Sequence, residues 1–193
     1  MDYLNILESA VTSKNKKPNG ELVYEALLSA EKENRKESIK YNFEQLWGEW
    51  RLTFITGTKS SQKKMGGLLG KGFYLPPLAK ITISYNADSD NPKSLQGRVA
   101  NKVNVGLVTF IISGPIKYVE KRNIMAFDFN HLSMSILGNK LYEQDVRGGV
   151  KSEHEFYINS ISKQAFFSYF LVTENFIAAR GRGGGLALWK KER

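Results

Sequence analysis

The chain contains no cysteine, which excludes disulfides, thiolate metal sites and a cysteine nucleophile, and which is typical of a reducing compartment. Histidine is scarce as well: only His131 and His154 are present, so a histidine-rich metal centre is not expected. No uninterrupted apolar stretch is long enough to span a bilayer as a helix. The start, MDYLNILESA, resembles neither a secretory signal nor a transit peptide. These absences predict a protein that is soluble, or that lies on a membrane without crossing it.

Positive charge is abundant. The 193 residues carry a formal net charge of +9, so the surface is expected to attract polyanions, either nucleic acid or anionic lipid headgroups. The sign of the charge does not choose between these partners. A basic surface that only keeps the protein soluble is an equally good interpretation.

The beginning of the chain has the pattern of helices. Apolar residues recur at helical spacing over 3–11 and again over 22–30, and the polar turn KNKKPNG separates the two segments. One more helical turn, YNFEQLW, leads to Trp47, where the pattern changes to the period of two that strands show. We therefore divide a single domain into a helical part, residues 1–46, and a β part, residues 47–193.

The β part predicts many short strands without helices between them, which favours an antiparallel meander closed as a barrel. The expected strands are 50–56, 79–85, 95–103, 105–112, 116–121, 124–129, 132–137, 166–173, 176–179 and 186–189. GLVTFIISG and AFFSYFLV are apolar on both faces, so one face should lie under the helices while the other lines an interior. The expected fold class is mainly β, an antiparallel β-barrel preceded by two short N-terminal α-helices. Such a barrel is either filled by its own side chains or holds one small ligand.

The glycine-rich motifs do not form a nucleotide site. MGGLLGKG is one residue short of a phosphate-binding loop, and FYLPP follows where a helix would be needed. We interpret it as a flap at the barrel mouth that contacts a membrane through Lys63, Lys64, Leu68, Leu69, Lys71 and Phe73, although a solvated loop explains it equally well. ARGRGGG indicates a tight hairpin. No residue stands at a spacing that suggests catalysis, so neither catalytic residues nor metal ligands are predicted.

Two segments carry a resemblance to a known family. WGEWRLTFIT resembles the opening strand of the plastid lipid-associated proteins, the plant and cyanobacterial fibrillin family, and YFLVTENFIAARGRGGGLALW resembles their closing segment. The opening helices and the central LQGRVANKVNV strand also fit, so the likeness covers nearly the whole chain. It implies a lipocalin-like barrel that binds apolar prenyl lipids, such as quinones or carotenoids, at thylakoid membranes or lipid globules. Since no transit peptide is seen, the chain is similar to a cyanobacterial member.

This family is similar to the lipocalins, in which a Gly-x-Trp motif on the first strand is covered by an arginine from the last. Gly48 and Trp50 match the motif, and Arg180 or Arg182 is the candidate arginine. The resemblance therefore implies that Trp50 is the barrel floor, held by a cation–π contact.

Strand alternation then predicts a ligand cavity, because large apolar side chains on one face of each strand gather when the barrel closes. Its expected lining is Trp50, Leu52, Phe54, Phe127, Phe129, Tyr169 and Leu171. A one-residue error in register would turn Phe127 and Phe129 outward.

The function expected from these features is non-enzymatic binding of one hydrophobic molecule, with peripheral attachment to an anionic membrane surface, that of the thylakoid, from the cytoplasmic side. No cofactor is expected apart from a bound lipid, quinone or carotenoid. The alternatives are a structural lipid-coating protein with a filled barrel, a basic nucleic-acid-binding protein, and an enzyme of chromophore or prenyl-lipid chemistry on the same fold. Nucleic acid ranks low as a partner, because the aromatics follow strand-core spacing.

Overall fold

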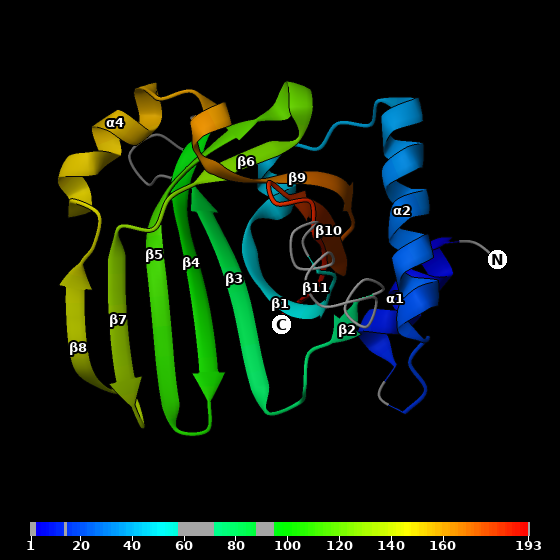
Figure 1. The fold of residues 1–193 in the computed structure, drawn as a ribbon, viewed down its shortest axis with the longest axis horizontal. Coiled ribbons are helices and arrows are strands. Elements are labelled where there is room, and N and C mark those ends of the chain that lie inside the picture. Colours follow the sequence, from blue (N-terminus) through cyan, green and yellow to red (C-terminus); the bar gives the residue numbers. More distant parts are fainter. Residues whose placement is uncertain (1–2, 14, 58–71, 88–94, 193) are drawn as a thin grey trace.

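The computed structural model describes residues 3–13, 15–57, 72–87 and 95–192. Helices α1 (Tyr3–Thr12) and α2 (Gly20–Glu37) pack against each other and lie along one side of the β structure (Figure 1). Asn19 caps α2, because its side chain accepts a hydrogen bond of 2.8 Å from the backbone N–H of Leu22. A short 3₁₀ turn, η1 (Phe43–Leu46), leads into the first strand.

Eight antiparallel strands of the described chain close into a barrel, in the order β1-β3-β4-β5-β6-β9-β10-β11 and back to β1. Their bounds are β1 (Gly48–Ile55), β3 (Ala79–Ala87), β4 (Gln96–Val105), β5 (Val108–Val119), β6 (Ile124–Phe127), β9 (Ala165–Val172), β10 (Phe176–Gly181) and β11 (Leu186–Lys191). The short strand β2 (Phe73–Tyr74) pairs with β1. The predicted fold class, a mainly β barrel preceded by two helices, is confirmed.

Part of the sheet extends beyond the barrel. The first half of β5 pairs with β7 (His131–Ile136), which pairs with β8 (Asn139–Asp145), whereas the second half of β5 pairs with β6 inside the barrel. The change of partner occurs at Gly114, where an added Cβ would lie 2.2 Å from the carbonyl oxygen of Asp128, so only glycine fits. We call the projecting part the arm: residues 79–83, 101–105, 108–113, 131–136 and 139–145 (Figure 1).

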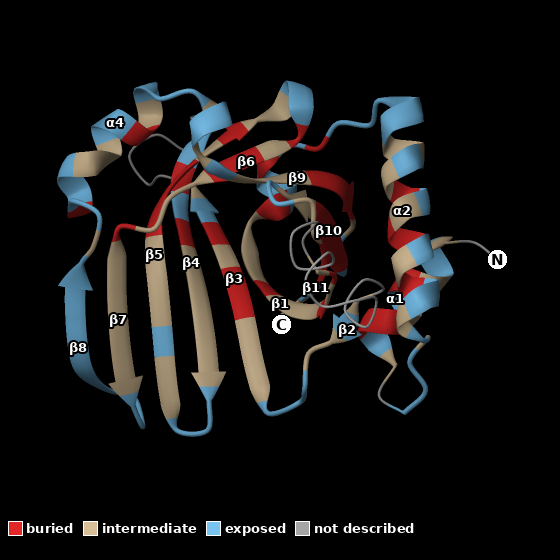
Figure 2. Cartoon of the chain, viewed as in Figure 1, coloured by how far each residue is buried: buried red, intermediate tan, exposed pale blue. Residues whose placement is uncertain are grey.

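Two hydrophobic cores follow from this arrangement. One fills the barrel around Trp50, Tyr85, Ile116 and Tyr169. The other joins the outer side of the barrel to the two helices, and its members include Leu7, Val23, Leu27, Phe54, Phe170 and Leu188. Figure 2 shows buried residues along the barrel and the inner side of the helices, while the arm is mostly of intermediate burial and β8 is exposed throughout.

The structure differs from the predicted elements in three places. The expected strands 105–112 and 116–121 form a single strand, β5, which passes through Pro115. β8 and the short helix α4 (Glu153–Ile158) were not predicted, because neither shows a clear apolar period. The remaining short turns are η2 (Glu120–Arg122), η3 (Gly149–Ser152) and η4 (Ile161–Lys163).

Candidate functional site: the barrel interior and its open end

One end of the barrel is closed over Trp50, which is fully buried and donates a hydrogen bond of 2.7 Å from its indole N–H to the Leu46 carbonyl oxygen. Lys191 stands opposite Trp50 in the β1–β11 register, and its Nζ lies 4.0 Å from the centre of the indole. The same Nζ donates to the Trp47 carbonyl oxygen at 2.5 Å. Partial burial lowers the pKa of Lys191, because desolvation disfavours the charged ammonium. The contacts with Trp50 and with the Trp47 carbonyl oxygen oppose this effect and stabilise the charge.

Gly48 completes this closure. Its φ of 110° lies in the region that favours glycine, and an added Cβ would lie 2.9 Å from the Lys191 Nζ. Gly48 thus leaves room for the cation that covers the indole two residues later.

The predicted arginine partner of Trp50 is wrong. The Arg180 guanidinium instead holds Glu31 of α2 through hydrogen bonds of 2.7 and 2.5 Å, and this carboxylate raises the pKa of Arg180. Arg182 donates to the Gln164 carbonyl oxygen. Both arginines lie toward the far end of β10, where the strand runs into the turn to β11, so neither can reach the closed end.

The middle of the barrel is filled by side chains. The hydroxyl oxygens of Tyr85 and Tyr169 lie 2.7 Å apart, and burial raises the pKa of both phenols, so both are neutral near pH 7. Ile116, Met125 and Ile177, all fully buried, pack in the same cluster. Among the described residues, this level of the barrel is a packed core that includes Trp50.

Aromatic rings continue from this core toward the end of the barrel away from Trp50, which the described residues leave partly exposed and which we call the open end. Trp189 lies 5.3 Å from Phe167, Phe167 lies 5.1 Å from Phe127, and Phe127 lies 5.4 Å from Phe129, measured between ring centres. Trp189 is buried, but the three phenylalanines are only partly buried. We call Phe127, Phe129 and Phe167 the aromatic mouth. Leu52, which pairs with Trp189 across β1 and β11, is also partly buried and packs on the same core.

The seven residues predicted to line one cavity are divided between the two cores. Trp50, Leu52, Phe127, Phe129 and Tyr169 face the barrel interior, as predicted. Phe54 and Leu171 face the helices instead, so their assignment to the interior is wrong. The cause is a pair of register shifts, one between Leu52 and Phe54 and one between Ala178 and Ala179, because a bulge reverses the side-chain alternation beyond it.

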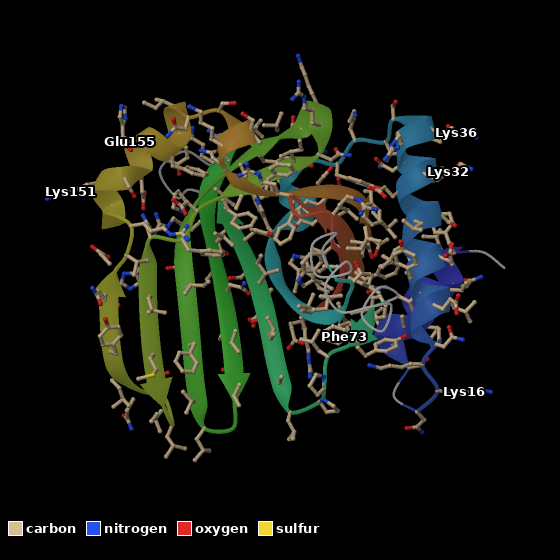
Figure 3. All side chains as sticks on the ribbon, viewed as in Figure 1. Lys16, Lys32, Lys36, Phe73, Lys151 and Glu155 are labelled. Carbon is tan, nitrogen blue, oxygen red and sulfur yellow. The ribbon has the colours of Figure 1, made fainter. Side chains whose placement is uncertain are left out.

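Of the residues predicted to contact a membrane, Lys63, Lys64, Leu68, Leu69 and Lys71 lie outside the described residues. Phe73 is described, and it is 40% exposed on β2 (Figure 3). Its neighbour Tyr74 packs edge-on against Phe54 with a centroid distance of 5.2 Å. Among the described helices, none is both long enough and apolar enough to cross a bilayer.

A polar cleft of about 330 Å³ adjoins the mouth. Phe127 forms part of its wall, and Asp128, Arg147, Glu155, Lys163 and Gln164 supply polar groups. The Arg147 guanidinium donates to the Asp128 carboxylate at 2.9 Å. The open end of the barrel is therefore an aromatic surface with charged and amide groups at its border, a combination that suits an apolar molecule with a polar end.

His131 does not belong to this site. Its ring nitrogens lie 3.0 Å from Asp145 and 3.0 Å from Glu143, across the β7–β8 pair. The hydrogen bond to Asp145, followed by the interactions with Glu143, raises the pKa of His131. The three side chains thus link β8, the outermost strand, to β7 through electrostatic contacts.

Comparison with known proteins adds little to this geometry. No protein-family model matches the chain, and no curated protein matches it. Among solved structures, a redesigned β-barrel is similar with a TM-score of 0.35 and 9% sequence identity, over 78% of this chain and 95% of that chain. A likeness this distant carries no functional argument. The resemblance to the fibrillin family thus stays a prediction.

Proposed function

We propose that this protein binds one small hydrophobic molecule at the open end of its barrel, without converting it chemically. The observation that carries the proposal is the aromatic mouth, whose three rings continue the core outward yet stay partly exposed. Exposed aromatic surface that adjoins a packed core is costly in water, and an apolar ligand that covers it removes that cost. Because side chains pack the centre of the barrel, we propose that the ligand lies near Trp189 and not above Trp50.

The ring geometry supports a planar, unsaturated ligand. Phe127 and Phe167 are tilted by 31°, and Phe127 and Phe129 by 53°, so the mouth offers ring faces as well as edges. Offset and edge-to-face contacts add about 0.5–1.5 kcal/mol per ring pair to the gain from buried area. A prenyl quinone, a carotenoid or another conjugated lipid matches this surface, and the neighbouring polar cleft suits a carbonyl or hydroxyl at one end.

We place this activity at a membrane surface, peripheral to the thylakoid, because apolar ligands of this class reside in lipid. The sequence resemblance and the net charge of +9 support this location, since anionic headgroups attract a basic protein.

Fluorescence titration with a short-chain prenyl benzoquinone tests the binding proposal. We expect saturable quenching that Trp189→Phe largely removes and Trp50→Phe leaves, because Trp189 lies next to the mouth. Phe129→Ala should weaken binding about two- to tenfold, the equivalent of one aromatic contact. Phe166→Ala is the matched control, since Phe166 precedes Phe167 on β9 and points to the opposite face. Quenching that is unsaturable, or equal in all four variants, would refute ligand binding at the mouth.

A second candidate is a structural lipid-coating protein with a filled barrel. The fully buried Trp50, Tyr85, Tyr169 and Met125 favour it, because they fill the barrel interior. The same titration separates the two: a coating protein binds lipid vesicles but shows no saturable quenching by a quinone in the absence of vesicles.

A further inference from the structure

The arm ends in a row of exposed apolar side chains. Leu78, in the turn before β3, is 89% exposed; Leu107, in the β4–β5 turn, is 64% exposed; and Leu137, in the β7–β8 turn, is 70% exposed. Val105 and Ile136 flank these turns and are also exposed. All three turns lie along one edge of the sheet, the lower edge in Figure 1, and the N–H of Leu137 donates to the carbonyl oxygen of Leu107. We call Leu78, Leu107 and Leu137 the apolar tips.

The tips project into open space. Gly106 and Gly138, beside Leu107 and Leu137, have no atom within 4 Å of an added Cβ. The strands of the arm run in the order β3-β4-β5-β7-β8, so the tips, from the start of β3 to the turn between β7 and β8, span roughly 17 Å at the usual strand spacing. A row of exposed leucines on projecting turns matches a deformable apolar surface better than it matches a groove.

Leu137 has an unfavourable backbone conformation for its residue type. Its φ is 51°, and Gly138 follows with a φ of 83°, which together make a turn that favours Asn-Gly. A leucine in the left-handed region costs stability. Because this side chain is 70% exposed, it makes no compensating core contact within the described fold. Such a cost is explained if the side chain has a partner outside the fold.

One face of the arm continues the apolar character of the tips. Cross-strand pairing aligns Ile81, Val103, Phe110, Met134 and Tyr142 in a single row on that face. On the opposite face the corresponding row is polar except at Ile111: Thr82, Lys102, Ile111, Ser133 and Glu143. The arm is thus two-sided, with its apolar side continuous with the barrel interior at Ile83.

Charges near the tips are neutralised. Lys80 pairs with Glu192 at 2.5 Å, Lys102 with Glu49 at 3.0 Å, and Lys140 with Glu143 at 2.5 Å. The tips themselves carry no ionisable group. A surface that is apolar at its edge and electrically balanced behind it is complementary to uncharged hydrocarbon and not to a polyanion.

We propose that the apolar tips insert into the hydrocarbon boundary of a lipid bilayer and dock the protein there. This inference deepens the proposed function by assigning the membrane-contacting surface, and it rests on that function for the ligand that such docking would deliver. Insertion buries three leucine side chains that are otherwise in water and leaves the paired lysines at the depth of the headgroups.

A second copy of the chain is a poorer occupant. The exposed edge strand β8 has a register shift opposite Met134 and Ser135, and it carries Lys140, Glu143 and Asp145. Bulges and charges on an edge strand are the features that prevent edge-to-edge pairing. Sheet-to-sheet pairing would use the apolar face and leave the tips in water.

Cosedimentation of the full chain with vesicles of neutral phosphatidylcholine tests the docking surface. We expect Leu137→Asn to lower the partition coefficient about tenfold, since burial of one leucine contributes at least that factor. The same variant should keep or raise the melting temperature, because asparagine fits the turn. Ile158→Asn, on α4, is the matched control, with a side chain that is also 70% exposed. Leu107→Ser should act like Leu137→Asn.

Binding at two salt concentrations distinguishes insertion of apolar side chains from electrostatic attraction to the headgroups. Anionic vesicles should bind the protein more tightly at low salt, but the ratio between wild type and Leu137→Asn should be the same at both about 0.1 M and about 0.5 M salt. Partition coefficients that are unchanged in both tip variants, or wild-type binding that disappears entirely at the higher salt, would overturn the proposal. So would a change of oligomeric state in Leu137→Asn with no change in vesicle binding. Quinone quenching in the absence of vesicles is independent of the tips, so its loss or persistence reports on the proposed function alone.

Discussion

The contact between Lys191 and Trp50 gives a prediction whose size follows from the structure. Lys191→Met removes the charge and keeps most of the aliphatic side chain. The loss includes a cation–π contact at 4.0 Å, about 0.5–2 kcal/mol, and a charged hydrogen bond to the Trp47 carbonyl oxygen, about 1.5–3 kcal/mol. The desolvation that lowers the pKa of Lys191 opposes both. We therefore expect a net destabilisation of about 2 kcal/mol, or roughly 4–8 °C in Tm for a domain of this size.

Denaturant unfolding of single and double variants measures this coupling. Lys191→Met and Trp50→Phe should be non-additive, whereas Arg182→Ala and Trp50→Phe should add within about 0.5 kcal/mol, because Arg182 lies at the other end of the barrel. Lys190→Met is the matched control, since Lys190 is adjacent and exposed. An unchanged stability in Lys191→Met, or a coupling of Arg182 with Trp50, would refute this account of the closed end.

Two further predictions concern the barrel centre and the arm. Tyr85→Phe should lower the free energy of unfolding by about 1–2 kcal/mol in denaturant titrations, because it leaves the buried Tyr169 hydroxyl without its partner. The double variant Tyr85→Phe, Tyr169→Phe should recover part of that loss. If the loss in the double variant equals the sum of the losses in the two single variants, the prediction is contradicted. The folded-state pKa of His131 is raised above 6.5, so its stabilising contribution is complete below that unfolded value and is lost as the pH rises through the higher folded value. Amide hydrogen-exchange protection of β7 and β8, corrected for the intrinsic rate, should therefore fall over this pH range in the wild type and stay constant in His131→Gln. Identical pH profiles in the two proteins would contradict an electrostatic link through His131.

The sequence allowed much of the fold to be predicted. Helical spacing identified both opening helices, and the period of two identified most of the barrel strands. Trp50 is fully buried at a closed end, as the Gly-x-Trp motif implied. The helices and strands depend on local periodicity, which a single sequence displays directly, whereas the closed end at Trp50 was implied by the family resemblance.

The parts that could not be predicted depend on irregularities of pairing. The bulges near Leu52 and Ala178 have no residue signature, yet they decide that Phe54 and Leu171 face the helices. β8 has no apolar alternation, because it is exposed along its whole length. The cation over Trp50 required knowledge of the β1–β11 register, which places Lys191 opposite Trp50 and the two arginines elsewhere. Only the position of Lys191 near the end of the last strand hinted at this role.

The same bulges explain why function is expected at the end of the barrel opposite Trp50. By reversing the alternation, they let β1 and β9 supply side chains to the interior along one part of their length and to the helices along another. Phe54, Phe170 and Leu171 thereby pack against α1 and α2 on the outer side of the barrel, while Trp50 and Tyr169 fill the interior. Neither group is available to a partner. The apolar surface that the described fold leaves accessible includes exposed side chains on the arm, such as Phe110 and Tyr142, and the partly buried rings of the aromatic mouth. The proposed binding and the stability of the fold therefore depend on different residues.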